Sequence, residues 1–357
     1  MKKVLLTTVH PAPYINGWVE KLKINYEIEV LYYLEKSKYK AYTDFIPCTG
    51  KYMGKLTYIE LYRCVLHSDL IILGGWKKIR WFFLLLCGRL LKRKVALFSD
   101  YPMPQKKNLI YLVKKCIFRS CLDYVLCATK STCNYYASLY GFGMNRLYIF
   151  PYASVDIDHI NKNYWPIRIE EIAAGDKIRV FIANSFFPRK GYNTVVKALE
   201  RLKCDGLLNR FSFRIAGIGD EYEVYEKKFQ ELDADIKLLG WLEDSEYNLF
   251  MQNTDIYIHA SSFEPFGIPP IDAMIYGKVL IVSKGVKSVE AFIVDGVNGY
   301  TICPNDHNKL YEHLKYILQN THSMEKVGNE ATNEIGRHYN NNIVLETLNK
   351  LFSQHSE

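Results

Sequence analysis

The chain has 357 residues, more than one hydrophobic core usually supports, so its length predicts two domains. Its composition, 49% hydrophobic and 24% charged, excludes a disordered or low-complexity protein. Residues 1–160 hold 24 Lys and Arg against 11 Asp and Glu, a net charge of +13, whereas residues 161–357 hold 22 against 27, a net charge of −5. We therefore expect the first half to meet an anionic surface or ligand.

Strands and helices alternate through the first half. Apolar runs predict strands over Val4–Val9, Glu27–Tyr33, Leu70–Leu73, Lys94–Ser99, Tyr124–Thr129 and Leu147–Phe150. Helical spacing predicts helices over Gly17–Asn25, Trp81–Leu91, Lys106–Arg119 and Ser131–Tyr140. The first apolar run is too short for the core of a secretion signal, so we expect a cytoplasmic protein.

A polar, broken stretch over residues 156–176 predicts a linker, and a second alternating half follows it. Its expected strands are Arg179–Ala183, Ser212–Ala216, Ile236–Leu239, Asp255–Ala260, Val279–Val282 and Gly299–Ile302. The predicted fold class is α/β, with two doubly wound domains, residues 1–160 and 177–339, that face each other across a cleft. We expect the final helix, within residues 340–357, to pack back on the first domain.

Basic side chains flank the apolar helix Trp81–Leu91, which is too short to span a bilayer. They include Lys77, Lys78, Arg80, Arg89, Lys92, Arg93 and Lys94, with Lys106, Lys107, Lys114, Lys115 and Arg119 further along. One interpretation is a buried helix beside a solvated basic loop; the other is a face that rests on an anionic membrane. No nucleic-acid-binding motif accompanies these residues, so we expect no nucleic-acid partner. The nine cysteines have no metal-site spacing, and we expect neither a metal nor a disulfide.

The stretch Ser261–Gly277 is the most informative part of the chain. It joins two apolar strands and predicts a loop followed by a short helix. Glu264 and Asp272 lie on either side of the start of that helix, with seven residues between them. A helix N-terminus attracts anions, whereas a nearby acid binds hydroxyls or stabilises positive charge. Together these features predict a site for a sugar attached to a diphosphate, although an acid in a first helical turn is also favoured in any protein.

Two other strand ends in the second half carry candidate ligand contacts. Arg189 and Lys190 precede Gly191 at a strand-to-helix turn, where they could either hold a phosphate or form a solvated basic turn. Gly217 and Gly219 form a Gly-x-Gly turn that allows close backbone approach. This turn lacks the third glycine of the dinucleotide motif, which argues against a nicotinamide enzyme.

With these residues in order, the second half resembles the nucleotide-sugar domain of the family-four retaining glycosyltransferases, which have the GT-B fold. The resemblance is close from Arg179 to Leu318 and looser in the first half. The residues that carry it are Lys190-Gly191, Gly217-Ile218-Gly219, Gly240, Ser261-Ser262-x-Glu264-x-Phe266-Gly267, Ala273-Met274, Gly277, Glu290 and Asp295-Gly296-x-Asn298-Gly299, with Gly17 and Pro151 to Asp156 in the first half.

The resemblance implies roles for the matching positions. Glu264 would act near the donor sugar, Asp272 would bind the ribose, and Lys190 would hold the diphosphate. Backbone N–H groups of Phe266, Gly267 and Ile268 would cap that diphosphate. Enzymes of this fold generally need no metal and no cofactor besides the nucleotide sugar. On the acceptor side the candidates are Asn16, Gly17 and Asp100.

This chain departs from the family pattern at three positions. Asp272 stands where the family has Glu, Ser185 stands where it has an arginine that Arg189 might replace, and Asp100 aligns near a frequent histidine. Pro269 and Pro270 also remove two N–H donors from the helix start.

The resemblance and the residues together predict a retaining transferase that moves a hexose from a nucleotide diphosphate sugar to a glycan hydroxyl. We favour a UDP-sugar over GDP-mannose as donor, and a lipid-linked acceptor in surface polysaccharide synthesis, with the enzyme peripheral on the inner face of the cytoplasmic membrane. The alternatives are a catalytically inactive nucleotide-sugar-binding partner protein and a nucleotide-sugar epimerase of the same fold.

Overall fold

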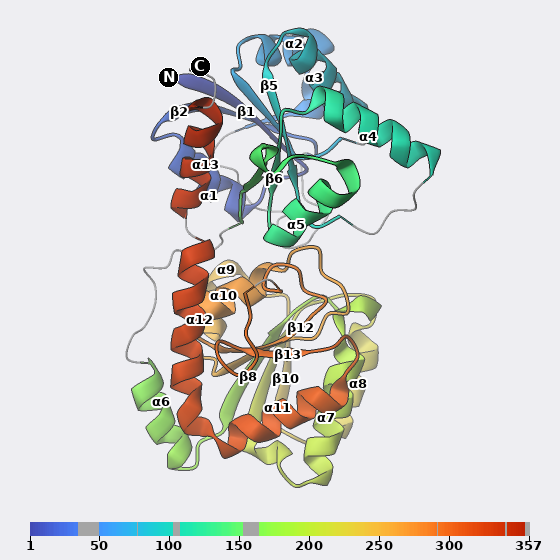
Figure 1. Ribbon diagram of the computed structural model, residues 1–357. Helices are drawn as coiled ribbons and strands as arrows, with labels where there is room; N and C mark the ends of the chain where they lie inside the picture. Colours follow the sequence, from blue (N-terminus) through green and yellow to red (C-terminus); the bar gives the residue numbers. More distant parts are fainter. Residues whose placement is uncertain are drawn as a thin grey trace. The chain divides into compact units, whose positions relative to one another are not determined.

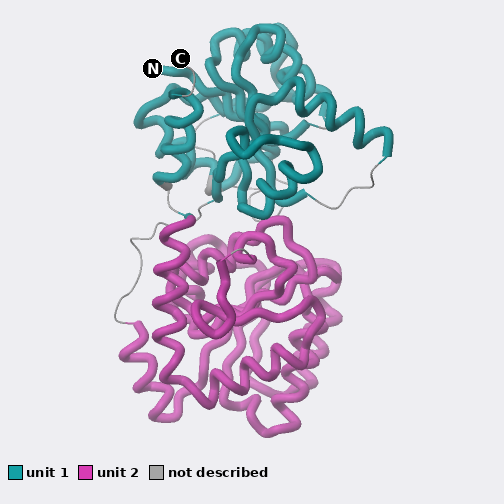
Figure 2. Tube along the Cα trace, in the orientation of Figure 1, with its two compact units in different colours: residues 1–154, 339–357 teal, residues 155–338 magenta. Residues whose placement is uncertain are grey.

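The structure, a computed structural model, describes residues 1–34, 50–76, 78–102, 108–152, 164–290, 292–339 and 341–353. It divides into two compact units, residues 1–154 with 339–357 and residues 155–338 (Figure 2). Lys77, Lys106 and Lys107, named above, lie outside the described residues, as does Cys48, one of the nine cysteines.

Unit 1 contains a parallel sheet in the order β3-β2-β1-β4-β5-β6-β7 (Figure 1). Its strands are β1 (Lys2–Thr8), β2 (Tyr26–Tyr32), β3 (Lys51–Tyr52), β4 (Leu70–Leu73), β5 (Lys94–Ser99), β6 (Tyr124–Cys127) and β7 (Leu147–Ile149). Its helices are α1 (Pro13–Leu22), α2 (Tyr58–Leu66), α3 (Ile79–Leu90), α4 (Leu109–Cys121), α5 (Lys130–Tyr135), the π-helical turn η3 (Tyr136–Tyr140) and α13 (Asn341–Ser353). Every strand pair is parallel, as expected when helices connect successive strands.

The two faces of this sheet build two separate cores. One core joins α2, α3, α4, α5 and η3 to the sheet, and the other joins α1 and α13 to the opposite face. The last helix, α13, buries Val344, Leu348 and Leu351 there, beside α1 (Figure 1). The hydroxyl of Thr347 donates to the carbonyl of Ile149 at 3.0 Å, and this bond ties α13 to β7. The end of the chain therefore completes unit 1.

Unit 2 has a second parallel sheet, in the order β10-β9-β8-β11-β12-β13. Its strands are β8 (Ile178–Ala183), β9 (Phe211–Ala216), β10 (Ile236–Gly240), β11 (Ile256–His259), β12 (Val279–Ser283) and β13 (Tyr300–Ile302). Its helices are α6 (Tyr164–Ala173), α7 (Tyr192–Cys204), α8 (Tyr222–Glu231), α9 (Asp244–Gln252), α10 (Ile268–Ile275), α11 (His307–Gln319) and α12 (Met324–His338). The strand order reverses direction between β8 and β11, where ligands bind in open α/β sheets.

Part of the expected linker is instead the helix α6. The prediction of a linker over residues 156–176 is wrong for Tyr164–Ala173, because long-range contacts hold that segment in unit 2. The indole of Trp165 donates to the carbonyl of Gly277 at 2.8 Å, and Arg168 is buried. The segment is rich in charged residues because several of its charged side chains form ion pairs within unit 2.

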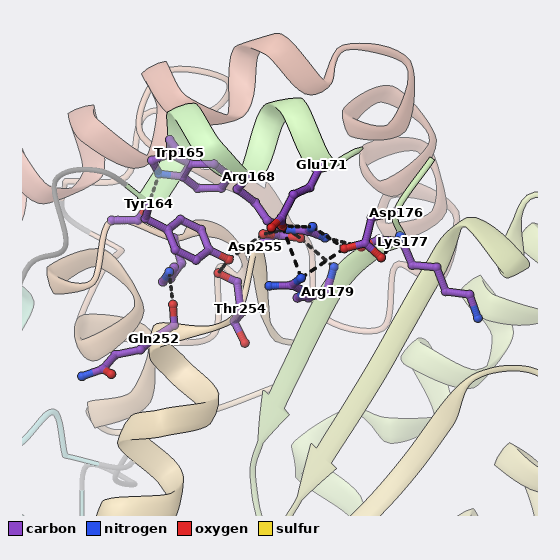
Figure 3. A network of polar contacts seen from close by, with 12 residues as sticks. Tyr164, Trp165, Arg168, Glu171, Asp176, Lys177, Arg179, Gln252, Thr254 and Asp255 are labelled. Carbon is purple, nitrogen blue, oxygen red and sulfur yellow. Dashed lines mark hydrogen bonds and ion pairs between the residues drawn. The ribbon is translucent and has the colours of Figure 1, made fainter. Parts of the chain in front are cut away.

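Arg168 is the centre of a polar network at the amino end of β11 (Figure 3). Its Nε lies 2.9 and 3.0 Å from the two carboxylate oxygens of Asp255, and its Nη1 lies 2.8 Å from Glu171 Oε2. Asp255 also accepts from the hydroxyl of Tyr164 at 2.6 Å and from the backbone N–H of Arg179 at 2.7 Å. The network thus joins α6 to the first residues of β8 and β11.

We expect the Asp255→Ala variant to lose about 3–5 kcal/mol of unfolding free energy, because Arg168 then keeps a buried charge without its innermost partner. Urea unfolding of the full chain, followed by circular dichroism, measures the loss. A matched control is Glu312→Gln, which removes an exposed ion pair with Lys309 and should change stability by less than about 0.5 kcal/mol. Equal stabilities for the two variants would contradict the role given to Asp255.

Candidate active site

Three loops meet at the carboxyl edge of the unit 2 sheet, after the neighbouring strands β8, β11 and β12. The backbone N–H of Ser262 donates to the carbonyl of Arg189 at 2.8 Å, which joins the β11 loop to the β8 loop. Glu264 donates its N–H to Gly285 at 3.0 Å and accepts from the N–H of Lys287 at 3.1 Å, which joins the β11 loop to the β12 loop. These backbone bonds fix the position from which the Glu264 side chain starts.

The Glu264 carboxylate is held by two cations from the β8 loop. Its Oε2 forms an ion pair with Lys190 Nζ and a second one, at 3.0 Å, with Arg189 Nη1. Arg189 also donates to the carbonyl of Phe263 at 2.9 Å. The side chains of Lys190 and Glu264 are 9% and 14% exposed, whereas that of Arg189 is 43% exposed. The structure therefore brings Glu264, Lys190 and Arg189 into contact, and only Arg189 is largely exposed to solvent.

Mutual pairing keeps this cluster ionised despite its burial. Burial alone raises the pKa of Glu264, but the charge and hydrogen bond of Lys190, with a further contribution from Arg189, lower that pKa below its usual value. Burial lowers the pKa of Lys190, and the Glu264 charge opposes that change. The cluster carries two positive charges against one negative charge, so an anion that enters it meets a net positive site.

Glycine is required at two turns of the site. Gly191 has a φ of +80°, and a Cβ there would lie 2.1 Å from the carbonyl oxygen of Ala260. Gly267 has a φ of +97° at the N-cap of α10, where a Cβ would lie 3.3 Å from Cγ of Glu264. A larger residue at position 191 would push the β8 loop away from the β11 loop. A larger residue at position 267 would push Glu264 away from the start of α10.

The start of α10 lies directly beyond Glu264, as the sequence predicted. Phe266 is buried, Gly267 is the N-cap and Ile268 is the first helical residue. The N–H and the hydroxyl of Ser288, from the β12 loop, donate to the carbonyls of Phe266 and Gly267 at 3.0 and 2.8 Å. The carbonyls of this turn therefore face the β12 loop.

The Gly-x-Gly turn packs against the chain itself. A Cβ on Gly217 would lie 1.9 Å from the carbonyl oxygen of Asn184, and one on Gly219 would lie 2.5 Å from that of Phe186. The close approach that these glycines permit is to the backbone of the β8 loop. Ser185 lies in that loop, half-buried, where its N–H donates to the Asn184 side chain at 3.1 Å.

Asp272 is buried within unit 2. It is only 1% exposed, and its Oδ2 accepts a hydrogen bond from the hydroxyl of Tyr247, on α9, at 2.8 Å. Burial and the Asp272 charge raise the pKa of Tyr247 well above its usual value, so Tyr247 keeps its proton. Contact of Asp272 with a ribose stays a prediction. In the structure, the Asp272 carboxylate is held by Tyr247.

Three polar residues beneath the site were missed by the sequence analysis. His259, the last residue of β11, is buried, and its two ring nitrogens lie 3.2 Å from the hydroxyl of Tyr257 and 3.4 Å from Nδ2 of Asn184. Asn184 also donates to the hydroxyl of Ser261 at 3.0 Å. A histidine that ends an apolar strand just before the Glu264 loop was the signal in the sequence.

Burial and the nearby charge of Lys190 lower the pKa of His259 to about 3, so this ring is neutral near pH 7. A neutral ring beneath the cluster adds no further positive charge to it. It can accept at one nitrogen and donate at the other, which fits its two polar neighbours.

The acceptor-side candidates all lie in unit 1. Asn16 and Gly17 are half-buried inside α1, which starts at Pro13 rather than at Gly17, and Asp100 directly follows β5. The next residue of α1, Trp18, helps to line a small pocket with Thr7, Thr8, Val9, Gly74, Phe98 and Tyr152. Trp18 stacks on Tyr152 there, with ring centroids 5.5 Å apart.

Among the residues that the structure describes, no group of three or more His, Cys, Asp or Glu side chains could hold a metal ion. No helix among those residues is both long enough and apolar enough to cross a bilayer.

The fold of this chain is found in solved structures. The Anabaena protein Alr3699/HepE in complex with UDP has a TM-score of 0.79 to this chain, at 15% identity over 99% of this chain and 100% of that one. TarM of S. aureus has a TM-score of 0.71 at 11% identity, again over 99% and 100%. The chain therefore has the GT-B fold that the sequence predicted, with two parallel α/β sheets.

The sequence of unit 2 matches a family model. Residues 164–334, just under half of the chain, match the family model described as Glycosyl transferases group 1. The match includes α6, so it begins before Lys177, where we had expected the domain to start.

Curated relatives match over shorter stretches. A Klebsiella pneumoniae protein named "Uncharacterized 41.2 kDa protein in cps region" is 27% identical over 138 residues, which are 38% of this chain and 36% of that protein. The alpha-monoglucosyldiacylglycerol synthase of Acholeplasma laidlawii is 32% identical over 110 residues, 30% of this chain and 27% of that enzyme. The chain thus spans about a third of the length of these relatives.

We expect the free energy of unfolding to fall as the pH falls from 7 to 5. An unfolded His259 takes up a proton near pH 6.5, whereas the folded ring stays neutral down to about pH 3, so the unfolded chain binds more protons in this range. The contribution of His259 to the loss at pH 5 is on the order of 2 kcal/mol.

Guanidinium unfolding at pH 7 and pH 5 measures this loss. The His259→Gln variant should lose less stability between the two pH values than the wild type does. His322→Gln, at an exposed position of unit 2, should keep the wild-type dependence. An unchanged pH dependence in His259→Gln would show that His259 is not held neutral.

Proposed function

We propose that this chain is a retaining hexosyltransferase that moves a hexose from a UDP-sugar to a hydroxyl of a glycan acceptor. The observation that carries the proposal is the cluster of Glu264, Lys190 and Arg189 beside the start of α10, in a domain that matches the glycosyl transferases group 1 family. Such a cluster suits a ligand with a diphosphate next to a sugar.

The choice of UDP over GDP rests on structural neighbours. The Anabaena protein was crystallised in complex with UDP and, separately, with UDP-glucose, the latter structure having a TM-score of 0.75 to this chain at 15% identity. At that identity the likeness supports the fold, and the donor of this chain is part of the proposal.

The two cations would stabilise the leaving diphosphate. As the bond between the sugar and the diphosphate breaks, negative charge grows on the phosphate oxygens, and Lys190 and Arg189 are already positioned to meet it. One preorganised donor of this kind is worth about 3 kcal/mol of transition-state stabilisation. The N–H groups of Gly267 and Ile268 and the dipole of α10 would add to this effect.

Glu264 would act on the sugar side of the same bond. In the present structure its carboxylate pairs with both Lys190 and Arg189. A bound diphosphate would take over those two cations, and the carboxylate would then be available to orient the sugar and to stabilise positive charge near its anomeric carbon. We propose that this exchange of partners couples donor binding to preparation of the reaction.

The remaining contacts to the donor would come from other residues of the same site. Asp272 would bind the ribose, with Tyr247 as the group that holds its carboxylate in place before the nucleotide arrives. Phe266 packs under the loop, and the turn of Gly217 and Gly219 supports the β8 loop from below. No metal ion is needed in this scheme, because cationic side chains and a helix N-terminus meet the diphosphate.

A lipid-linked glycan of a surface polysaccharide is the acceptor that we propose. The Klebsiella relative is named for a cps region, and the Acholeplasma relative is named as the synthase of a glycolipid. Asn16, Gly17, Asp100 and the pocket beside Trp18 are the acceptor-side candidates in unit 1.

An inactive nucleotide-sugar-binding protein is the second candidate, and Ser185 is the observation that favours it. Ser185 stands at the position of a family arginine and is bonded to its neighbour Asn184. Arg189 contacts Glu264 directly and is the residue that would replace that arginine. Nucleotide binding without turnover, with every acceptor tried, would favour this second candidate.

We expect Glu264→Gln to lower donor turnover at least ~100-fold, because the variant loses the negative charge beside the sugar. UDP binding should be as tight as in the wild type or tighter, since the carboxylate no longer competes for the two cations. A thermal-shift screen of UDP, GDP and their sugars identifies the donor, and release of UDP measures turnover. Glu312→Gln serves as the control, and a Glu264→Gln enzyme with wild-type turnover would rule out the proposed role.

Lys190→Met should weaken UDP binding by roughly 30-fold or more, the equivalent of about 2 kcal/mol. The variant also leaves Glu264 with Arg189 alone, so the double variant Lys190→Met with Glu264→Gln separates lost binding from lost folding. Titration calorimetry with UDP measures both. The exposed Lys309→Met is the matched control, and unchanged UDP affinity in the double variant would exclude Lys190 as a phosphate ligand.

A further inference from the structure

Three successive helices of unit 1 start with aliphatic side chains that face solvent. Ile59 is the second residue of α2, Ile79 is the first of α3, and Leu109 and Ile110 are the first two of α4. At least two-thirds of each of these four side chains is exposed. Tyr62, Phe82, Leu112 and Val113, one turn further along the same helices, are exposed as well.

These helix starts belong to one edge of one layer. The inner sides of α2, α3 and α4 fill the same core against one face of the sheet (Figure 1). Each helix follows the carboxyl end of a parallel strand, so the three N-termini lie along the same edge. Tyr58 at the start of α2 contacts Phe83 of α3, with ring centroids 4.9 Å apart. We call Ile59, Ile79, Leu109 and Ile110 with Lys55 and Lys78 the helix-start surface.

The segment that contains these three helices is strongly positive as a whole. Residues 50–121 hold 15 Lys and Arg against 3 Asp and Glu. Lys55 ends the short 3-10 turn Met53–Lys55 just before α2, Lys78 is the N-cap of α3, and both are exposed. Cations at a helix N-terminus oppose the helix dipole, and the first turns of α3 and α4 contain no acidic residue. Helix stability therefore does not explain Lys78 at the start of α3, whose charge fits an anionic partner, whereas the first turn of α2 carries the acid Glu60.

The structure moves the candidate membrane surface away from residues 92–94. Arg93 donates to the carbonyl of Leu66 at 2.7 Å, and Lys94 donates to the carbonyl of Leu351, on α13, at 2.5 Å. Trp81, Leu84 and Leu85 of α3 are buried. The basic run after α3 is thus partly engaged in internal bonds, whereas the first residues of α3 present apolar side chains to solvent.

We propose that the helix-start surface binds an anionic lipid bilayer, with the aliphatic side chains entering the interface and the lysines meeting the lipid headgroups. Exposed aliphatic residues interspersed with cations are the composition of an interfacial surface. A second copy of the chain fits less well, because two surfaces of this charge repel each other. The proposal concerns lipid binding alone and holds whichever sugar the chain transfers.

Co-flotation of the full chain with phosphatidylcholine vesicles, with and without phosphatidylglycerol, tests this surface. We expect binding only to the vesicles that contain phosphatidylglycerol. The triple variant Ile79→Ser, Leu109→Ser and Ile110→Ser should lower that binding about tenfold or more. The pair Lys55→Gln and Lys78→Gln should lower it roughly fivefold for each lysine.

Matched controls come from unit 2. Val224→Ser, Leu249→Ser and Val297→Ser remove exposed aliphatic residues, and Lys227→Gln with Lys237→Gln removes exposed lysines. These variants should bind vesicles like the wild type. Thermal shift with UDP checks that each variant is folded, and Glu264→Gln, which is altered only in the proposed donor site, should keep full vesicle binding.

Three results would overturn the proposal. The first is no binding of the wild type to phosphatidylglycerol, and the second is equal loss of binding in the test and control variants. The third is a wild-type dimer in sedimentation velocity that the triple variant dissociates, with no vesicle binding, which would assign the surface to a second copy.

Discussion

The proposed donor site of this protein depends on the ion pair between Glu264 and Lys190, which are 74 residues apart in the chain. Two largely buried charges are tolerated because each stabilises the other, and Arg189 adds a second cation to the same oxygen. Their meeting follows from sheet topology, since β8 and β11 are neighbours and the loops after parallel strands emerge at one edge. A substitution that separates those loops would remove the site even with all its side chains present.

Strand β11 has a polar contact at each of its ends. Its amino end is fixed by Asp255, which binds Arg168 and so attaches α6 to the sheet. Its carboxyl end is His259, a neutral buried ring below the charged cluster. The strand between them is fully buried. A rigid strand with a paired acid at one end and the Glu264 loop at the other explains how a loop rich in polar groups keeps a defined position.

The two units differ in how their cationic side chains are placed for the binding that we propose. In the proposed donor site of unit 2, two cations are aimed at one carboxylate. In unit 1, exposed aliphatic residues at three helix starts are accompanied by exposed Lys55 and Lys78. A donor site needs a few charges with fixed geometry, whereas a surface that meets headgroups needs only an average field. The uneven net charge of the sequence therefore reflects two different kinds of recognition.

The sequence alone determined the α/β class, most strand positions and the family resemblance, and it singled out Glu264 and Lys190 as candidates, because apolar periodicity and the order of short motifs are local properties of the chain. Only the tertiary structure decided that residues 164–173 form a helix of unit 2, since Trp165 and Arg168 find their partners near β11 and β12. The enclosure of Asp272 by Tyr247 was likewise hidden, because it depends on the packing of α9 against α10. Local pattern predicts which residues form an element, but the partner of a buried polar group is set by segments distant in sequence, and those contacts exist only in the folded chain.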